Sequence, residues 1–284
     1  MDNTDASKLL MKVDTNIKLE SVILSDENKE KISNFLNEIE HRKLFTEYGL
    51  HPMNKLLFYG ASGTGKTLLA KALSNTMNYK MLYIDIARAL SNASVAINMV
   101  NIFELAEKLK NCIIFLDECD SITMSRYNSD YNDTAEVRRA TDSLFQLLDQ
   151  MSTENVFIAA TNLLFKIDPA FERRMDLKLE FKRPNMNIKD VINFFLLPKF
   201  TCKDDVDPTI ENIVSRRAKE NSKLSYYELQ VLVERAMKRA LINGTNIVHT
   251  SDIYNDLAIS MKVKILFGTQ DDPKEIFDRP KDNY

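Results

Sequence analysis

The residues best suited to chemistry lie in FYGASGTGKTLL, residues 58–69. This stretch fits GxxxxGK[ST], with Gly60, Gly65, Lys66 and Thr67 at the fixed positions between a strand-like apolar run and a helical run. Glycines let backbone N–H groups converge on an oxyanion, and the start of a helix adds partial positive charge there. The loop therefore predicts a cradle for the phosphates of a nucleotide.

Individual roles follow from the positions within this loop. Lys66 is expected to reach the β- and γ-phosphates, and the Thr67 hydroxyl is expected to ligate Mg²⁺. The alternative is a chance glycine turn, but three of the chain's six glycines fall between residues 60 and 65. The other expected phosphate-binding positions are those of the loop and the first helical turn, namely Gly60, Ser62, Gly63, Thr64, Gly65 and Leu68.

Two acids follow another apolar run, CIIFLDECD at 112–120. They would stand at the carboxyl end of a buried strand, where the ligands of open α/β sheets lie. We expect Asp117 to support Mg²⁺, directly or through water, and Glu118 to polarise the attacking water as a general base. Acids also end strands as solvated caps, but a position about 50 residues after a phosphate loop favours the functional interpretation.

The run VFIAATN ends in Asn162, which would reach the γ-phosphate or the attacking water from a neighbouring strand. Its alternative role is that of an ordinary turn-forming asparagine. Next comes KIDPAFERRMD, 166–176, with Arg173 and Arg174 side by side. Paired arginines near a sheet edge are ordinarily surface charges that contribute little to stability.

The elements that position these residues alternate between short apolar strands and helical patterns, which is typical of an α/β fold. We expect a five-stranded parallel sheet flanked by helices on both faces. An amphipathic helix after Asp26 precedes the first strand, and a helix starting at Asp133 with a capping box at Glu136 follows the third. The expected strands are 55–60, 80–86, 112–117, 156–162 and 177–181.

Beyond Pro184 the strand pattern stops and helical patterns continue. The best-defined helix there begins with a capping box formed by Ser225 and Glu228. We therefore expect a smaller all-α lid domain after the sheet. The expected organisation is a polar leader at 1–19, an α/β core at 20–185, the helical lid at 186–263 and a tail at 264–284.

Composition excludes several classes of protein. The net charge of −3 and the scattered basic residues disfavour a sequence-independent grip on nucleic acid. The cysteines, Cys112, Cys119 and Cys202, have no paired spacing, which favours a reduced compartment over a disulfide scaffold or a zinc site. No apolar run approaches the roughly 18 residues of a membrane-spanning helix. These features predict a cytoplasmic protein without a membrane segment.

The order of the motifs resembles that of the AAA family of ring-forming ATPases. The matching parts are the phosphate loop GASGTGKT, the acidic strand end FLDECDS, the polar sensor AATN and the segment DPAFERRMD. The resemblance implies hydrolysis of the β–γ bond of ATP with Mg²⁺. It also implies that Arg173 and Arg174 act as arginine fingers on the ATP of a neighbouring subunit, so the partners are copies of the chain, as a hexameric ring with shared ATP sites.

The same resemblance suggests where the adenine binds. Val22 or Ile23, before the first core helix, would line the base pocket together with the turn at 224–226. The broader superfamily often has a sensor arginine at the start of the lid helix, and LSYYELQ has none. Lys223 is the nearest basic residue that could take its place.

One part of the chain departs from the family pattern. Protein-threading members carry an aromatic residue and a glycine in the loop after the second strand, but the corresponding LSNASVAIN, 90–98, has neither. Tyr127 and Tyr131 could face the pore from a second loop, or could be ordinary exposed tyrosines. The client protein or adaptor is not identified by any motif.

Three functions remain open at this stage. The first is an ATP-driven enzyme that remodels, unfolds or disassembles a client or partner protein. The second is an ATP-gated assembly module whose slow turnover serves as a timer for a partner, and the missing pore aromatic favours it. The third is a DNA-associated loader ATPase, which predicts a basic patch for which only the pairs at 138–139 and 173–174 are candidates.

Overall fold

The computed structural model describes residues 17–84, 95–123, 135–184, 187–220 and 224–266. The chain divides into two compact units, Met1–Lys182 and Arg183–Tyr284. None of the described helices is both long and apolar enough to cross a lipid bilayer. The expected helix start at Asp133 lies outside the described residues.

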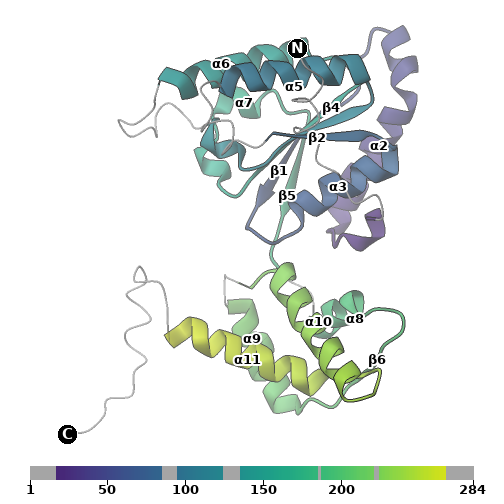
Figure 1. Ribbon diagram of the computed structural model, residues 1–284, viewed down its shortest axis with the longest axis vertical. Helices are drawn as coiled ribbons and strands as arrows, with labels where there is room; N and C mark the ends of the chain where they lie inside the picture. Colours follow the sequence, from purple (N-terminus) through teal and green to yellow (C-terminus); the bar gives the residue numbers. More distant parts are fainter. Residues whose placement is uncertain (1–16, 85–94, 124–134, 185–186, 221–223, 267–284) are drawn as a thin grey trace, which may run out of the picture. The chain divides into compact units, whose positions relative to one another are not determined.

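The first unit is built around a parallel five-stranded sheet with the strand order β2-β3-β4-β1-β5 (Figure 1). β1 lies between β4 and the edge strand β5, so the loop that follows β1 emerges beside the end of the central strand β4. The α/β fold and its five parallel strands are confirmed. The strands are β1 (Lys55–Gly60), β2 (Lys80–Ile84), β3 (Cys112–Leu116), β4 (Val156–Thr161) and β5 (Leu177–Phe181).

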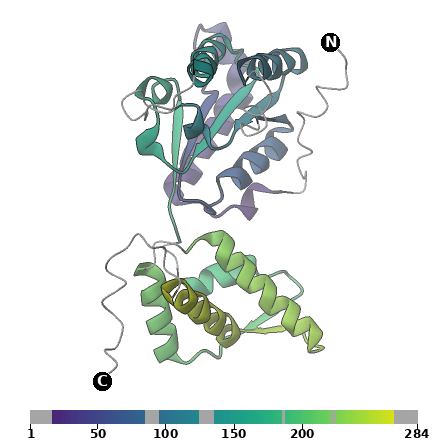
Figure 2. The same ribbon diagram turned by 60° about the vertical axis from the view of Figure 1, so that its left-hand side comes forward.

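Helices cover both faces of this sheet, as Figures 1 and 2 show. One apolar layer joins the sheet to α5 (Val95–Leu109) and α6 (Ala135–Gln150). The other joins it to α2 (Asp26–Glu47) and α3 (Lys66–Met77). Every residue of β3 and β4 is buried, which explains why these strands read as continuous apolar runs rather than as alternating patterns.

The second unit is mainly helical. The predicted capping box is present at the start of α10, where Ser225 and Glu228 each accept a hydrogen bond from the other's backbone. Its helices are α8 (Ile188–Phe195), α9 (Pro208–Glu220), α10 (Tyr226–Ile242) and α11 (Thr250–Leu266).

This unit differs from the all-α expectation in one respect. It also contains a parallel pair of strands, β6 (Thr201–Lys203) and β7 (Ile247–His249). Each strand has three residues, which is too few for an alternating pattern to stand out in the sequence.

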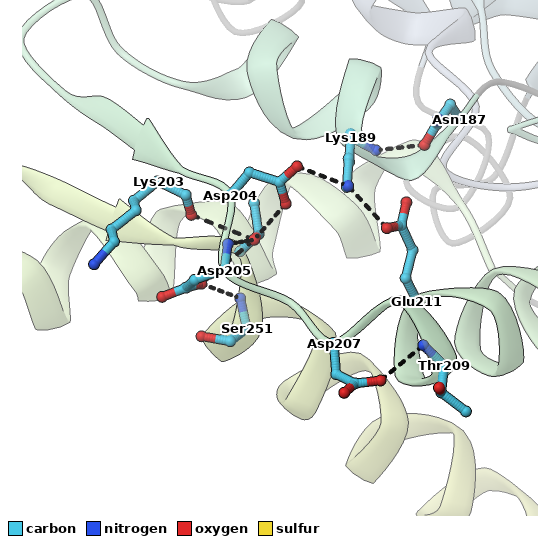
Figure 3. Close-up of polar contacts among 10 residues, drawn as sticks. Asn187, Lys189, Lys203, Asp204, Asp205, Asp207, Thr209, Glu211 and Ser251 are labelled. Atoms are coloured by element: carbon cyan, nitrogen blue, oxygen red, sulfur yellow. Dashed lines mark hydrogen bonds and ion pairs between the residues drawn. The ribbon is translucent and has the colours of Figure 1, made fainter.

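A polar cluster ties the helices of the second unit together (Figure 3). The Lys189 amine on α8 lies 2.8 Å from carboxylate oxygens of both Asp204, just after β6, and Glu211 on α9. Asp205 accepts a hydrogen bond from the Ser251 backbone in the first turn of α11. A hydrogen bond from His249 is the main reason that the pKa of the Asp205 carboxyl lies below its ordinary value. The cluster therefore links α8, α9 and α11 through the end of the small sheet.

Candidate functional site

The loop between β1 and α3 has the backbone that an anion cradle needs. Gly60, Gly63 and Gly65 all have positive φ angles, of 137°, 72° and 104°. A side chain at Gly60 would also collide with β5, because its Cβ would lie 2.1 Å from the backbone oxygen of Phe181. Glycine is therefore required at position 60 by both space and conformation. The loop delivers the chain into α3, whose first residue is Lys66.

Gly60→Ala is expected to disrupt the loop rather than merely strain it. The colliding atom belongs to the backbone of β5, so it cannot move aside as a flexible side chain would. We expect a loss of about 2 kcal/mol or more in unfolding free energy, together with loss of nucleotide binding. Urea unfolding followed by circular dichroism measures the first quantity. Gly49→Ala, at a positive-φ glycine with no atom within 4 Å of the added carbon, is the control and should cost less.

Lys66 is buried at the centre of the site, with 7% of its surface exposed. Its amine donates hydrogen bonds to the Gly60 oxygen at 2.7 Å, the Ala61 oxygen at 2.8 Å and Asn162 Oδ1 at 2.8 Å. Burial lowers the pKa of this amine, and the carboxylates of Asp117 and Asp120 oppose that shift. A lysine ammonium has three donors, so a phosphate oxygen that binds here must replace one of these acceptors.

Two oxygen ligands suited to magnesium lie beside the lysine. Thr67 Oγ1, at the start of α3, donates to Asp117 Oδ2 over 3.0 Å. The two positions are 50 residues apart in sequence, and the order of β1 and β3 within the sheet brings them together. A hydroxyl and a carboxylate are hard oxygen ligands of the kind that Mg²⁺ accepts, so this pair fits the expected metal.

Glu118 directly follows Asp117 in a tight turn. Its φ of 49° places it in the left-handed region, its N–H donates to Asp117 Oδ1 at 3.0 Å, and its oxygen accepts from Ser121 Oγ at 2.7 Å. The residue is exposed. The next residue, Cys119, is fully buried, and burial raises the pKa of its thiol far above the ordinary value. Cys119 is thus an unreactive core residue.

Asn162 stands at the end of β4, facing the lysine. An ammonium only donates, so the amide oxygen must be the atom directed at Lys66, and the amide NH₂ is left for another acceptor. The preceding Thr161 uses its hydroxyl twice: Oγ1 donates to Asp120 Oδ1 at 2.7 Å and accepts from the Leu163 N–H at 2.9 Å. The sequence predicted no role for Asp120 and Thr161, although Asp120 lies two residues after Glu118 and Thr161 directly precedes Asn162.

The two adjacent arginines have different surroundings. Arg174 donates to both carboxylate oxygens of Asp149 at 2.9 Å, and its guanidinium lies 4.5 Å from the centre of the Phe145 ring. The hydrogen bond to Asp149 raises the pKa of Arg174. Arg173 ends the short helix α7 (Pro169–Glu172) and is exposed, and no described residue bonds to its side chain. Of the two side chains, only that of Arg174 is held by other described residues.

The remaining predicted positions fall in several places. Val22 is buried against the phosphate loop, 3.8 Å from where a Gly65 Cβ would lie, and Ile23 next to it is half-buried. The turn at 224–226 belongs to the second unit. Tyr127, Tyr131, Lys223 and residues 90–94 of the proposed pore loop lie outside the described residues. The structure thus brings Lys66, Thr67, Asp117, Glu118 and Asn162 to one edge of the sheet.

Comparison with known proteins identifies relatives of this chain. Residues 56–183 match the family model described as "ATPase family associated with various cellular activities (AAA)". The chain is 30% identical to a 26S proteasome regulatory subunit 6B homolog of Dictyostelium discoideum, over 79% of this chain and 56% of the relative. It is 34% identical to proteasome-activating nucleotidase 1 of Haloferax volcanii, over 60% and 43%. The chain spans about half the length of the curated relatives that it matches.

Proposed function

Since this chain belongs to the AAA family of ATPases, we propose that it binds ATP with Mg²⁺, hydrolyses the β–γ bond and uses the cycle to remodel a protein partner. The observation that carries the proposal is that polar side chains from different strand ends meet around Lys66. Its amine contacts Asn162 Oδ1, while the adjacent Thr67 hydroxyl contacts Asp117. The residues to which we assign phosphate binding, magnesium binding and contact with the γ-phosphate therefore lie next to one another.

The residues divide the work of phosphoryl transfer among them. The loop amides and Lys66 would hold the phosphates. Thr67 and Asp117 would hold Mg²⁺, which would supply positive charge near the phosphate oxygens. Glu118 accepts a proton from the attacking water while the water oxygen bonds to the γ-phosphorus. The bond from that phosphorus to the β–γ bridging oxygen breaks, and ADP leaves with this oxygen. Asn162 offers its amide NH₂ to the γ-phosphate or to that water, because its oxygen already faces Lys66.

One more positive charge is needed near the γ-phosphate, and we assign it to Arg173 of a neighbouring copy. This side chain is exposed and is not bonded to any of the described residues, whereas Arg174 is held by Asp149 within its own subunit. Such a shared site requires an oligomer, and a hexameric ring is the arrangement that the family resemblance implies. The relatives are named for proteasome regulation or activation, which supports a protein client over a nucleic acid.

The second candidate is an ATP-gated assembly module with slow turnover. The segment LSNASVAIN, 90–98, favours it, because it contains neither the aromatic residue nor the glycine with which threading ATPases grip polypeptide. In that case ATP would chiefly control assembly and partner binding. The two candidate functions share the same ATP site. They differ in the rate at which the protein hydrolyses ATP when a client is present.

The proposal is tested by measuring molecular size and ATPase rate together, over a range of protein concentrations, with ATP or ADP. We expect the rate per chain to rise as the protein assembles. Lys66→Ala should weaken ATP binding by at least about 10-fold, because it removes a charged donor from the phosphates. Lys71→Ala, on the same helix, is the control. Equal ATP affinity in the Lys66→Ala and unsubstituted chains would refute the site.

A further inference from the structure

Two turns that carry the water-handling groups are joined by one side-chain hydrogen bond. The first turn follows β3 and contains Glu118 and the short 3₁₀ segment Cys119–Ser121, with Asp120 at its centre. The second follows β4 and contains Asn162. Thr161 Oγ1 lies 2.7 Å from Asp120 Oδ1, and the two residues are 41 positions apart in sequence. This contact fixes one turn against the other.

The direction of the bonds at the Thr161 hydroxyl is determined by its partners. A carboxylate only accepts, so the single hydroxyl proton must point to Asp120. The oxygen then keeps its lone pairs for the Leu163 N–H, which approaches at 2.9 Å. Asn162 is therefore held on both sides. Thr161, the residue before it, is bonded to Asp120, and Leu163, the residue after it, is bonded to Thr161.

Burial protects the hydrogen bond between Thr161 and Asp120 from competition by water. Thr161 is buried, with 1% of its surface exposed, so water cannot easily replace its partners. A change at Asp120 or Thr161 would thus reach Asn162 through the backbone on either side of it.

We propose that Asp120 and Thr161 are positioning residues that lock the Asn162 turn to the Glu118 turn, so that the sensor amide and the base address the same water. This inference rests on the proposed ATPase function. Neither residue needs to touch the nucleotide. Their effect should therefore appear in turnover and not in ATP affinity, because the phosphate loop is built by other contacts.

Thr161→Val tests the proposal, because valine keeps the volume of threonine and removes both hydrogen bonds. We expect kcat to fall by about 10- to 100-fold, since small displacements of positioned groups have effects of that size. The Kd for ATP should change by less than about 3-fold, because Lys66 and the loop glycines are untouched. Thr161→Ser keeps the hydroxyl and should recover most of the lost rate. Asp120→Ala should lower kcat in the same way as Thr161→Val.

Amide hydrogen exchange at Leu163, measured without nucleotide, provides a readout that does not depend on hydrolysis. Exchange should speed up in Thr161→Val and stay slow in Thr161→Ser. Ser74→Ala is the matched control, because it removes another buried hydroxyl bond, of 2.7 Å to the Tyr79 oxygen, away from the site. It should leave kcat unchanged.

Several results would overturn the inference. They are an unchanged kcat in Thr161→Val, an unchanged exchange rate at Leu163, or an ATP affinity that falls in parallel with kcat. A chain that is inactive before substitution but shows the expected change at Leu163 would instead refute the ATPase proposal and leave the structural lock supported.

Discussion

Replacing Glu118 with glutamine is expected to reduce ATP hydrolysis by at least about 100-fold while ATP stays bound. General base catalysis contributes about 10²- to 10⁴-fold, and an amide of the same shape cannot accept the proton of the attacking water. Binding should survive because the contacts that build the turn come from the backbone of Glu118, which glutamine shares: its N–H donates to Asp117 and its oxygen accepts from Ser121.

This prediction is measured by single-turnover hydrolysis and by the Kd for ATP on the same preparation. If assembly depends on bound ATP, the variant should also accumulate as an oligomer, because its nucleotide is not consumed. Glu30→Gln removes an exposed carboxylate from α2 in the same unit and serves as the control for a general loss of charge. Turnover at the unsubstituted rate in Glu118→Gln would exclude Glu118 as the base.

The sequence predicted best those parts of the site whose residues lie close together along the chain. The phosphate loop and the helix after it are contiguous in sequence. The residue types and their order are therefore nearly sufficient to predict the geometry of the loop. The strands of the sheet were recognisable because strands buried on both faces read as apolar runs of five or six residues. The three-residue strands β6 and β7 leave no such signal.

The hydrogen bond between Asp120 and Thr161 could not be predicted, because apolar runs give the strands but not their order. The bond between Asp120 and Thr161 exists because β3 and β4 are neighbours in the sheet. The same limit applies to Arg173 and Arg174, which are the same residue type at adjacent positions. Only the packing of Asp149 and Phe145 against one of them separates their roles.

That separation leads to opposite expectations for the two arginines. Arg173→Ala should leave stability unchanged, since no described residue bonds to its side chain, and should lower kcat by about 10³-fold, as expected when an arginine finger is lost. Arg174→Ala should instead lower the unfolding free energy by about 1–2 kcal/mol, because it removes a bidentate ion pair and a cation–π contact. Thermal unfolding and steady-state ATPase assays on both variants measure these effects.

Asp149→Ala is the matched control for Arg174, because it breaks the same ion pair and keeps the arginine. If Arg174 has a structural role, Asp149→Ala and Arg174→Ala should lose similar stability. If Arg174 were the finger, freeing it from Asp149 would preserve or raise the ATPase rate, while Arg174→Ala would lose about as much activity as we expect for Arg173→Ala.

Mixing experiments decide whether Arg173 acts on a neighbouring copy. An Arg173→Ala subunit keeps its own ATP site but cannot supply the arginine to a neighbouring ATP site. A Lys66→Ala subunit has a damaged ATP site and an intact Arg173. When the two inactive variants assemble together, the first can hydrolyse ATP with the arginine of the second, so part of the activity should return. Mixing with the double variant Lys66→Ala/Arg173→Ala should restore none. If the first mixture gains no activity although size measurements show that the two variants co-assemble, Arg173 does not work across a subunit junction, and the shared-site proposal fails.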